Sequence, residues 1–421
     1  MCFNNFLGRV VAMTLVVTLV TACGGGGGSA TAVSNLPGTP PLNGLPLPPA
    51  VGNQLSVRVD AGPGGSGYNV NRLYTTVSIC LPGSTTQCQT IDHVLVDTGS
   101  TGLRLLSSAM APALNLSRAT GPTGLPLLNC AQFVDMSFAW GPVATADIVL
   151  AGKTAASVPI QIIADPAFNS LAAECSSGGT AITTAATLGA NGIVGMGLFK
   201  EDCGASCTTN PAYGNFYRTC TNTACTATVP TTVSIAKQVK NPVSLFATDN
   251  NGVLIDLPAV ATGTAPSLSG SLIFGMGTQA NNQLVPSAVL TTSSSGYINT
   301  LLAGQTMNNS FIDTGSNGLF FDLNSIPICS GASTGFYCPV SRINLSATLV
   351  GTNSVAVPVA FDVDNAFTLF STGHAVLPTL AGDIGYAQTF DWGLPFFYGR
   401  RVFIGIEGQP SSLGTGPLYA F

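Results

Sequence analysis

The residues best suited to chemistry stand in two copies of the tetrapeptide Asp-Thr-Gly-Ser. The first copy begins at Asp97, after the apolar run Val94 to Val96, and the second begins at Asp313, after Phe311-Ile312. Each copy leads through a Gly-Leu pair into a further apolar run. In both places an apolar strand is therefore predicted to deliver a carboxyl group onto a glycine turn.

Two carboxyl groups held side by side suit one kind of reaction. Like charges at close range cannot both ionise without a large penalty, so one carboxyl keeps its proton while the other acts as a base. Such a pair can activate a water molecule without a metal, a cysteine or a histidine. The sequence therefore predicts Asp97 and Asp313 as catalytic residues, with no metal and no cofactor.

The composition limits the fold and the partners. The chain has 421 residues, of which 46% are hydrophobic and 7% are charged. It contains no run of Lys and Arg, which argues against nucleic acid and anionic membrane surfaces as partners. With 49 glycines, 27 prolines and abundant Ser, Thr and Val, the chain favours many short strands joined by turns. We therefore expect an all-β protein with a large core.

The chain has two histidines, His93 and His374. A metal site with several histidine ligands is excluded by this number. A Ser-His-Asp triad would have to use one of the two, and the chain shows no Gly-x-Ser-x-Gly turn for its nucleophile. A structural or surface role is expected for both.

The first residues indicate export. Arg9 precedes an apolar run from Val10 to Val20, which is short for a bilayer span and is typical of a signal peptide. Val20-Thr21-Ala22-Cys23 resembles the lipobox of bacterial lipoproteins, which implies cleavage before Cys23 and lipid attachment to its sulfur. The glycines that follow would form a flexible tether, and Gly24 suggests the outer membrane, with the protein on its periplasmic or surface face. An ordinary signal peptide and an uncleaved anchor are the alternatives.

The cysteines agree with an oxidising compartment. Ten of the 12 remain once Cys2 and Cys23 are set aside. Several form close pairs, which predicts disulfide-closed loops. The close pairs are Cys80 with Cys88, Cys203 with Cys207, Cys220 with Cys225, and Cys329 with Cys338, leaving Cys130 and Cys175 over. The four cysteines between residues 203 and 225 leave their connectivity open, and a zinc cluster is a second interpretation of them.

The long-period repeat predicts a domain duplication. The second Asp-Thr-Gly-Ser stands 216 residues after the first, a spacing typical of two similar lobes rather than of a solenoid. The predicted parts are a signal peptide (1–22), a Gly/Pro-rich tether (23–66), an N-terminal lobe (67–200), a Cys-rich connection (201–240) and a C-terminal lobe (241–421). The first lobe is expected to contain a hairpin that turns at Gly141-Pro142.

These residues resemble the pepsin family of bilobal aspartic peptidases over roughly residues 68–421. Beyond the two loops, Ile193-Val194-Gly195 is similar to the motif that braces the first catalytic loop. Gly270 to Gly275 is similar to the strand that opens the second lobe, and Phe138 to Gly141 falls where the family has its flap, the hairpin that closes over substrate. The chain also looks like uncharacterised bacterial lipoproteins. The resemblance implies a two-lobed acid protease fold with an interlobe cleft.

The family's site residues carry over onto both loops. Asp97 and Asp313 become the catalytic dyad. The resemblance implies supporting roles for the other loop residues and for the flap. Thr98 and Thr314 would tie the loops by hydrogen bonds, Gly99 and Gly315 would permit close approach, Ser100 and Ser316 would orient the carboxyl groups, and Trp140 and Gly141 would form the flap.

The chain departs from the family at three places. The flap carries Trp140 where the family has a tyrosine, and Arg104 stands where the family has a tryptophan after the first catalytic serine. An Arg104 guanidinium on the Trp140 ring is one possible replacement for the usual contact, and a flap built differently is the other. In the second lobe the bracing motif aligns on Asp391-Trp392-Gly393, so that its first position is charged.

The sequence thus predicts an exported, lipid-anchored, monomeric aspartic endopeptidase with a peptide or protein substrate. One alternative is an inactive envelope lipoprotein that binds peptide or glycan between its lobes. The other is a structural envelope protein in which the repeat is only architectural. A close approach of the two carboxyl groups favours the enzyme.

Overall fold

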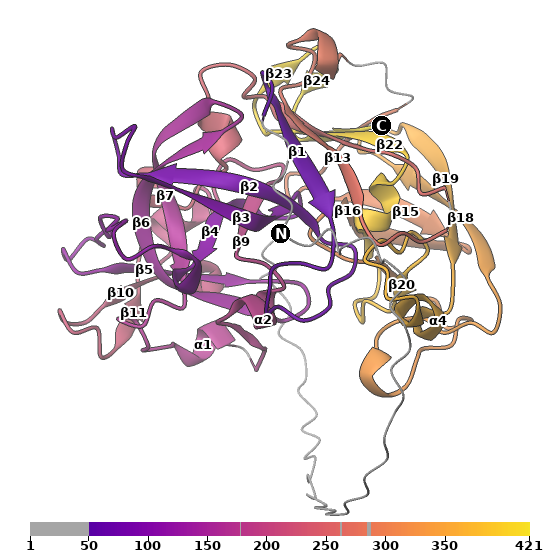
Figure 1. The fold of residues 1–421 in the computed structure, drawn as a ribbon, viewed down its shortest axis with the longest axis horizontal. Helices are drawn as coiled ribbons and strands as arrows, with labels where there is room; N and C mark the ends of the chain where they lie inside the picture. The colour runs from indigo at the N-terminus through magenta and orange to yellow at the C-terminus, as the bar shows by residue number, and fades with distance from the viewer. Residues whose placement is uncertain (1–49, 177, 262, 284–287) are drawn as a thin grey trace, which may run out of the picture.

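The computed structural model describes residues 50–176, 178–261, 263–283 and 288–421. This part of the chain is mainly β, and its helices are short, α4 (Ala366–Ser371) being six residues long. The strands gather into two lobes that lie beside each other (Figure 1). None of the helices in these ranges is long and apolar enough to cross a membrane. The predicted signal peptide and Cys23 lie outside the described residues.

The first lobe is built from strands that run from residue 73 to residue 230. In chain order they are β2 (Leu73–Cys80), β3 (Cys88–Asp97), β4 (Thr101–Leu106), β5 (Leu127–Gln132), β6 (Phe138–Leu150), β7 (Lys153–Ile163), β8 (Ala181–Ile182), β9 (Gly192–Met196), β10 (Tyr217–Cys220) and β11 (Thr228–Pro230). Short helices α1 (Ala173–Ser176), α2 (Ala185–Leu188) and α3 (Ser206–Thr209) lie between them. β4 is buried at every position because strands cover it on both sides.

The second lobe contributes strands to two sheets. A seven-stranded sheet has the order β19-β18-β15-β16-β21-β17-β20, made of β19 (Ala356–Val363), β18 (Ile343–Val350), β15 (Ile298–Leu302), β16 (Gln305–Ile312), β21 (Phe390–Trp392), β17 (Leu319–Phe321) and β20 (Ala381–Gly382). Five other strands belong to the 16-stranded sheet that the two lobes share, and these are β12 (Gly252–Leu257), β13 (Leu268–Phe274), β14 (Val289–Thr291), β22 (Arg400–Gly405) and β25 (Leu418–Ala420). The strands β23 (Pro410–Ser411) and β24 (Gly414–Thr415) form a two-stranded sheet of their own.

The strand that joins the lobes comes from the predicted tether. β1 (Gln54–Val59) pairs with β2 of the first lobe and, over its whole length, with β13 of the second. Its alternate residues Leu55, Val57 and Val59 are buried, as expected for a strand with one face on a core. The tether predicted over residues 23–66 is therefore wrong for β1, which is part of the fold.

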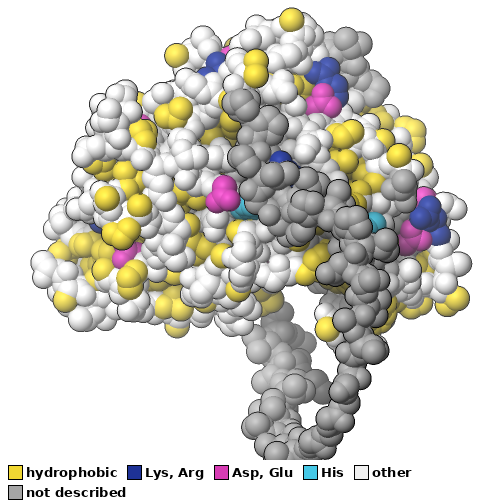
Figure 2. All heavy atoms as spheres, in the orientation of Figure 1, with side chains coloured by type: hydrophobic (Ala, Val, Ile, Leu, Met, Phe, Trp, Pro, Cys, Tyr) yellow, Lys and Arg dark blue, Asp and Glu magenta, His cyan; other side chains and the backbone are white. Residues whose placement is uncertain are grey.

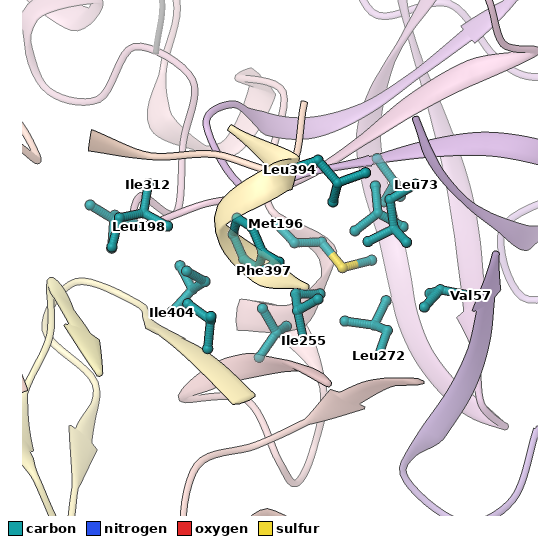
Figure 3. Packing of buried hydrophobic residues seen from close by; sticks show 14 of the residues in the cluster. Val57, Leu73, Met196, Leu198, Ile255, Leu272, Ile312, Leu394, Phe397 and Ile404 are labelled. Atoms are coloured by element: carbon teal, nitrogen blue, oxygen red, sulfur yellow. The ribbon is translucent and has the colours of Figure 1, made fainter. Parts of the chain in front are cut away.

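Side chains from both lobes share one core beneath this bridge. Figure 3 shows side chains of the core from strands of either lobe pointing into a common interior. The labelled residues are Val57, Leu73, Met196, Leu198, Ile255, Leu272, Ile312, Leu394, Phe397 and Ile404, each at most 2% exposed. Because residues adjacent to both Asp-Thr-Gly-Ser loops pack here, the core fixes the two lobes relative to each other.

The cysteine prediction is confirmed, with five disulfides in the described part of the chain. They are Cys80–Cys88, Cys130–Cys175, Cys203–Cys207, Cys220–Cys225 and Cys329–Cys338. The zinc interpretation of residues 203–225 is wrong, because all four sulfurs are in disulfide bonds.

Residues 201–240 are more than a connection. β10 pairs with β5 and β11 pairs with β10, so this segment widens the first lobe's sheet. The two ends of the segment lie side by side, because Glu201 pairs with Lys240. The segment therefore belongs to the first lobe. On the face of the molecule drawn in Figure 2, charged side chains occur only in small, separate groups.

Candidate active site

Both Asp-Thr-Gly-Ser loops are held by the same strand arrangement. β3 ends at Asp97 and lies parallel to β9, while β16 ends just before Asp313 and lies parallel to β21. Each loop then turns into a strand, β4 or β17, that runs antiparallel to the same neighbour. A parallel pair buried on both faces leaves little freedom at its end, so each carboxyl group has a fixed position.

The two loops bring their carboxyl groups together. The Gly99 N–H donates to Oδ1 of Asp97 and to Oδ1 of Asp313, at 2.9 Å in both cases. A Cβ on Gly99 would lie 2.6 Å from Cγ of Asp313, and one on Gly315 would lie 2.7 Å from Oδ1 of Asp97. Both glycines are therefore needed for the approach, as the sequence predicts.

The serines contact the outer carboxyl oxygens. Ser100 Oγ donates to Asp97 Oδ2 at 2.5 Å, and Ser316 Oγ donates to Asp313 Oδ2 at 2.9 Å. The inner oxygen of Asp313 also accepts the Gly315 N–H at 2.6 Å. Each carboxyl group is therefore oriented by its own loop, with one face left toward the other carboxyl.

The threonines tie the two loops in the predicted way. The Thr98 N–H donates to Thr314 Oγ1 at 3.1 Å, and the Thr314 N–H donates to Thr98 Oγ1 at 3.0 Å. Each hydroxyl also donates to the strand of the opposite lobe, Thr314 to the Val96 carbonyl at 2.7 Å and Thr98 to the Ile312 carbonyl at 3.5 Å. These reciprocal buried bonds hold the carboxyl groups at hydrogen-bonding range from opposite lobes.

The electrostatics favour a proton on one of the two carboxyl groups. Burial, and then the charge of Asp97, raise the pKa of Asp313 to about 7. Asp97 and Asp313 are 6% and 7% exposed, so water screens their repulsion weakly. The pair is therefore expected to hold one shared proton across the acidic range.

The turn predicted at Gly141-Pro142 is wrong, while Trp140 and Gly141 lie in the hairpin of β5 and β6. Both residues lie inside β6, and the hairpin turns at residues 133–137, where the Phe133 N–H donates to the Ser137 carbonyl. The Trp140 ring is 7% exposed and its Nε1 donates to the Phe168 carbonyl at 3.0 Å. A Cβ on Gly141 would lie 1.8 Å from the Ile162 carbonyl oxygen, so this glycine permits strand contact rather than a turn.

Arg104 faces away from Trp140 into a buried polar network that the sequence did not reveal. Its guanidinium donates to Asn129 Oδ1 at 2.5 Å, to Gln161 Oε1 at 2.7 Å and to Asp202 Oδ2 at 3.1 Å. Arg104 and Asp202 are each 1% exposed, and burial raises the pKa of Asp202 despite the guanidinium beside it. The proposed Arg104–Trp140 contact is therefore wrong, and the arginine has a structural role behind the first loop.

Two of the pockets bordered by the described residues lie away from the dyad. One, of about 330 Å³, lies in the second lobe against Phe361, Trp392 and Arg400. The other, of about 480 Å³, lies in the first lobe against Asn169 and Arg218. Neither is lined by Asp97 or Asp313. In the same ranges no group of three or more His, Cys, Asp and Glu side chains is placed to hold a metal ion.

The structure has two β lobes that each give an Asp-Thr-Gly-Ser loop to their junction, which is the two-lobed arrangement that the sequence predicts. The chain belongs to the family described as "Protein of unknown function (DUF3443)", whose model matches residues 49–421. No curated protein matches the sequence.

Solved structures with a similar fold include two that match nearly full-length. The aspartic proteinase from Irpex lacteus is 13% identical, with a TM-score of 0.48 over 87% of this chain and 96% of its own. Basic 7S globulin from soybean is 12% identical, with a TM-score of 0.44 over 88% of this chain and 94% of its own. At these values the likenesses do not bear on activity, which has to be argued from the site.

Proposed function

We propose that this chain is an aspartic endopeptidase whose dyad is Asp97 and Asp313. The observation that carries the proposal is the single Gly99 N–H that donates to the inner oxygens of both carboxyl groups. Two carboxyl groups that share a donor are close enough to share a proton and a water molecule. No structural need is evident for such a contact, since it sets two acids against each other in a buried place.

The proposed reaction is general acid–base hydrolysis of a peptide bond. The raised pKa of Asp313 favours Asp313 as the protonated partner and Asp97 as the base. Asp97 takes a proton from the water molecule while the water oxygen bonds to the scissile carbonyl carbon, and Asp313 gives its proton to the carbonyl oxygen. In the second half the amide nitrogen receives the proton held by Asp97, the C–N bond breaks, and Asp313 recovers its proton from the hydroxyl group.

The test is cleavage of a diverse peptide library by purified protein that lacks residues 1–23, over about pH 3 to 8. Asp97→Asn and Asp313→Asn should each abolish most activity, and the double variant should be little worse than either, since residues that act as a unit are non-additive. Asp135→Asn is the matched control, because Asp135 is an exposed carboxyl in the turn of residues 133–137. A statine-type peptide, which mimics the tetrahedral intermediate, should compete. Cleavage that persists in Asp97→Asn would refute the mechanism.

One observation favours a second candidate, a binding protein without catalysis. The dyad carboxyl groups are at most 7% exposed. A peptide or glycan would then bind without reaching them. Binding of library peptides with no cleavage at any pH, unchanged by Asp97→Asn, would support this candidate.

We further propose that the protein is exported and held to the cell envelope by lipid on Cys23. The support is the apolar run that ends at Val20-Thr21-Ala22-Cys23, together with five disulfides, which persist in oxidising compartments. Cys23→Ser should move the protein from the membrane fraction to the soluble fraction. A variant that stays in the membrane, or a mature wild-type chain that does not begin at a lipid-modified Cys23, would contradict this.

A further inference from the structure

A third carboxyl group lies directly behind the dyad. Asp391 is on β21, where it pairs with Phe311 near the end of β16. The next residue, Trp392, accepts the Asp313 N–H on its carbonyl at 3.0 Å. Asp391 is 0% exposed, and neither of its carboxyl oxygens accepts a hydrogen bond of good geometry. Within the described residues it forms no ion pair. A buried carboxylate in this state is strongly unfavourable, so stability does not explain an acid at this position.

The groups that face Asp391 are acids and hydroxyls. Asp313 lies at the end of β16 and Asp97 at the end of β3, and both charges, after burial, raise the pKa of Asp391 well above its ordinary value. Tyr419 on β25 is also near, since its own pKa is raised by burial and then by Asp313 and Asp391. Ser316 lies beside the residues that follow β21, since the Leu394 N–H donates to the Ser316 carbonyl at 2.8 Å, and its hydroxyl opposes the rise in the pKa of Asp391. These surroundings favour a neutral Asp391.

The first lobe has a different pair of residues at the same place. In the antiparallel pairing behind the first loop, Arg104 on β4 faces Ile193 on β9. In the equivalent pairing behind the second loop, Phe320 on β17 faces Asp391 on β21. An apolar residue is therefore accepted by this architecture, and the carboxyl group is particular to the lobe that carries Asp313.

We propose that Asp391 is a neutral carboxylic acid that positions Ser316 by donating a hydrogen bond to its Oγ. A hydroxyl group has one proton and can accept bonds on its oxygen. With Asp391 donating to it, the Ser316 proton stays directed at the outer oxygen of Asp313, where the structure places it at 2.9 Å. Asp391 does not touch substrate; it acts through Ser316 on the acid of the dyad, and the inference rests on the function proposed above.

The experiment compares Asp391→Asn and Asp391→Ile in the mature protein, with kcat and KM measured across about pH 3 to 8. The amide can still donate to Ser316, so Asp391→Asn should stay within about twofold of wild type. Asp391→Ile, which copies the first lobe, should lower kcat roughly tenfold at unchanged KM, the loss expected for one hydrogen bond. It should also move the alkaline limb of kcat upward, because an ionised Asp313 loses support.

A double-mutant cycle tests the route of the effect. In a Ser316→Ala background, Asp391→Ile should have no further effect, since both changes remove one positioned hydroxyl. The same tenfold loss in that background, an Asp391→Ile variant as active as wild type, or an Asp391→Asn variant as poor as Asp391→Ile would each overturn the proposal. Unfolding by urea separates misfolding from loss of positioning, since both single variants should be at least as stable as wild type.

A readout without activity separates this inference from the proposed function. Infrared difference spectra of wild type against Asp391→Asn at neutral pH should show the band of a protonated carboxyl group. If the wild type cleaves no peptide but shows this band, the proposed function fails while the neutral acid stands. If the band is absent, Asp391 is ionised and the inference fails, whatever the activity.

Discussion

Replacing Asp313 by asparagine should stabilise the protein at neutral pH while abolishing activity. The raised pKa means that folded Asp313 binds its proton more tightly than the unfolded chain does. The stabilising effect is complete below about pH 4, falls as the pH rises, and is lost above about pH 7. From an ordinary value of 3.8 to about 7, at about 1.4 kcal/mol per unit, the change is about 4 kcal/mol.

Asparagine has nearly the same shape and no charge, so the stability of Asp313→Asn does not depend on pH through this side chain. We expect Asp313→Asn to match the wild type within about 1 kcal/mol near pH 4 and to exceed it by about 2 to 4 kcal/mol near pH 8. Urea unfolding can be followed by tryptophan fluorescence, since Trp140 lies in the first lobe and Trp392 in the second, and both are buried. A Trp140→Phe background, used for every variant, leaves Trp392 as the reporter of the lobe that carries Asp313.

Two results would refute this reasoning. An Asp313→Asn variant that is less stable than wild type at both pH values would mean that hydrogen bonds to the carboxylate outweigh its burial. A stability difference that does not change between about pH 4 and 8 would mean that Asp313 titrates normally. Asp135→Asn provides the control, since an exposed carboxyl should leave the pH dependence as it is.

Two further predictions concern the supports of the site. Thr314→Val removes the acceptor of the buried Thr98 N–H and should lower the free energy of unfolding by about 2 to 4 kcal/mol. The control is Thr306→Val, an exposed position where the loss should be less than about 0.5 kcal/mol. Equal losses in the two variants would contradict the role of Thr314 in holding the loops together. Arg104→Met leaves Asp202 buried without its guanidinium partner and should lower the free energy of unfolding by about 3 to 5 kcal/mol. The double variant Arg104→Met/Asp202→Leu should recover much of that stability, because it also removes the buried charge. A double variant no more stable than the single one would contradict a charge effect.

The dyad and its loops could be predicted from sequence because their geometry is local. An apolar strand followed by Asp-Thr-Gly-Ser places the carboxyl, the hydroxyls and the close-approach glycine within one turn. The second copy supplies the partner, so no long-range information was needed to expect Asp97 beside Asp313. The hydrogen bonds between Thr98 and Thr314 follow from the same duplication.

The turn of the hairpin of β5 and β6 was misplaced because a turn signal and a contact signal use the same residues. Gly141-Pro142 has the composition of a turn, yet it lies within β6 where a neighbouring strand approaches. The residue that approaches, Ile162 on β7, stands 21 residues after Gly141, and no local pattern reports that contact. Asp135, whose carboxyl accepts the Ser137 N–H at 2.9 Å, was a local signal for the true turn.

β1 and the Arg104 network were missed because their partners lie far away in the sequence. The alternation of Leu55, Val57 and Val59 was visible, but the surrounding Gly and Pro residues indicated a tether. Its partner β13 lies more than 200 residues along the chain. Arg104 likewise meets Asp202 98 residues away, which no periodicity reports.

The duplicated frame explains how the two halves of the site can differ without loss of the fold. Each lobe has a cross-strand pair behind its loop with one ionisable and one apolar member, Arg104 with Ile193 and Asp391 with Phe320. The arginine is neutralised by Asp202, so it adds little net field at Asp97. Asp391 has no such partner and stands with Asp313 in one buried place. If Asp391 is neutral and donates to Ser316, as proposed above, the two carboxyl groups of identical motifs have different surroundings, which is the condition for the unequal roles of acid and base in the proposed reaction.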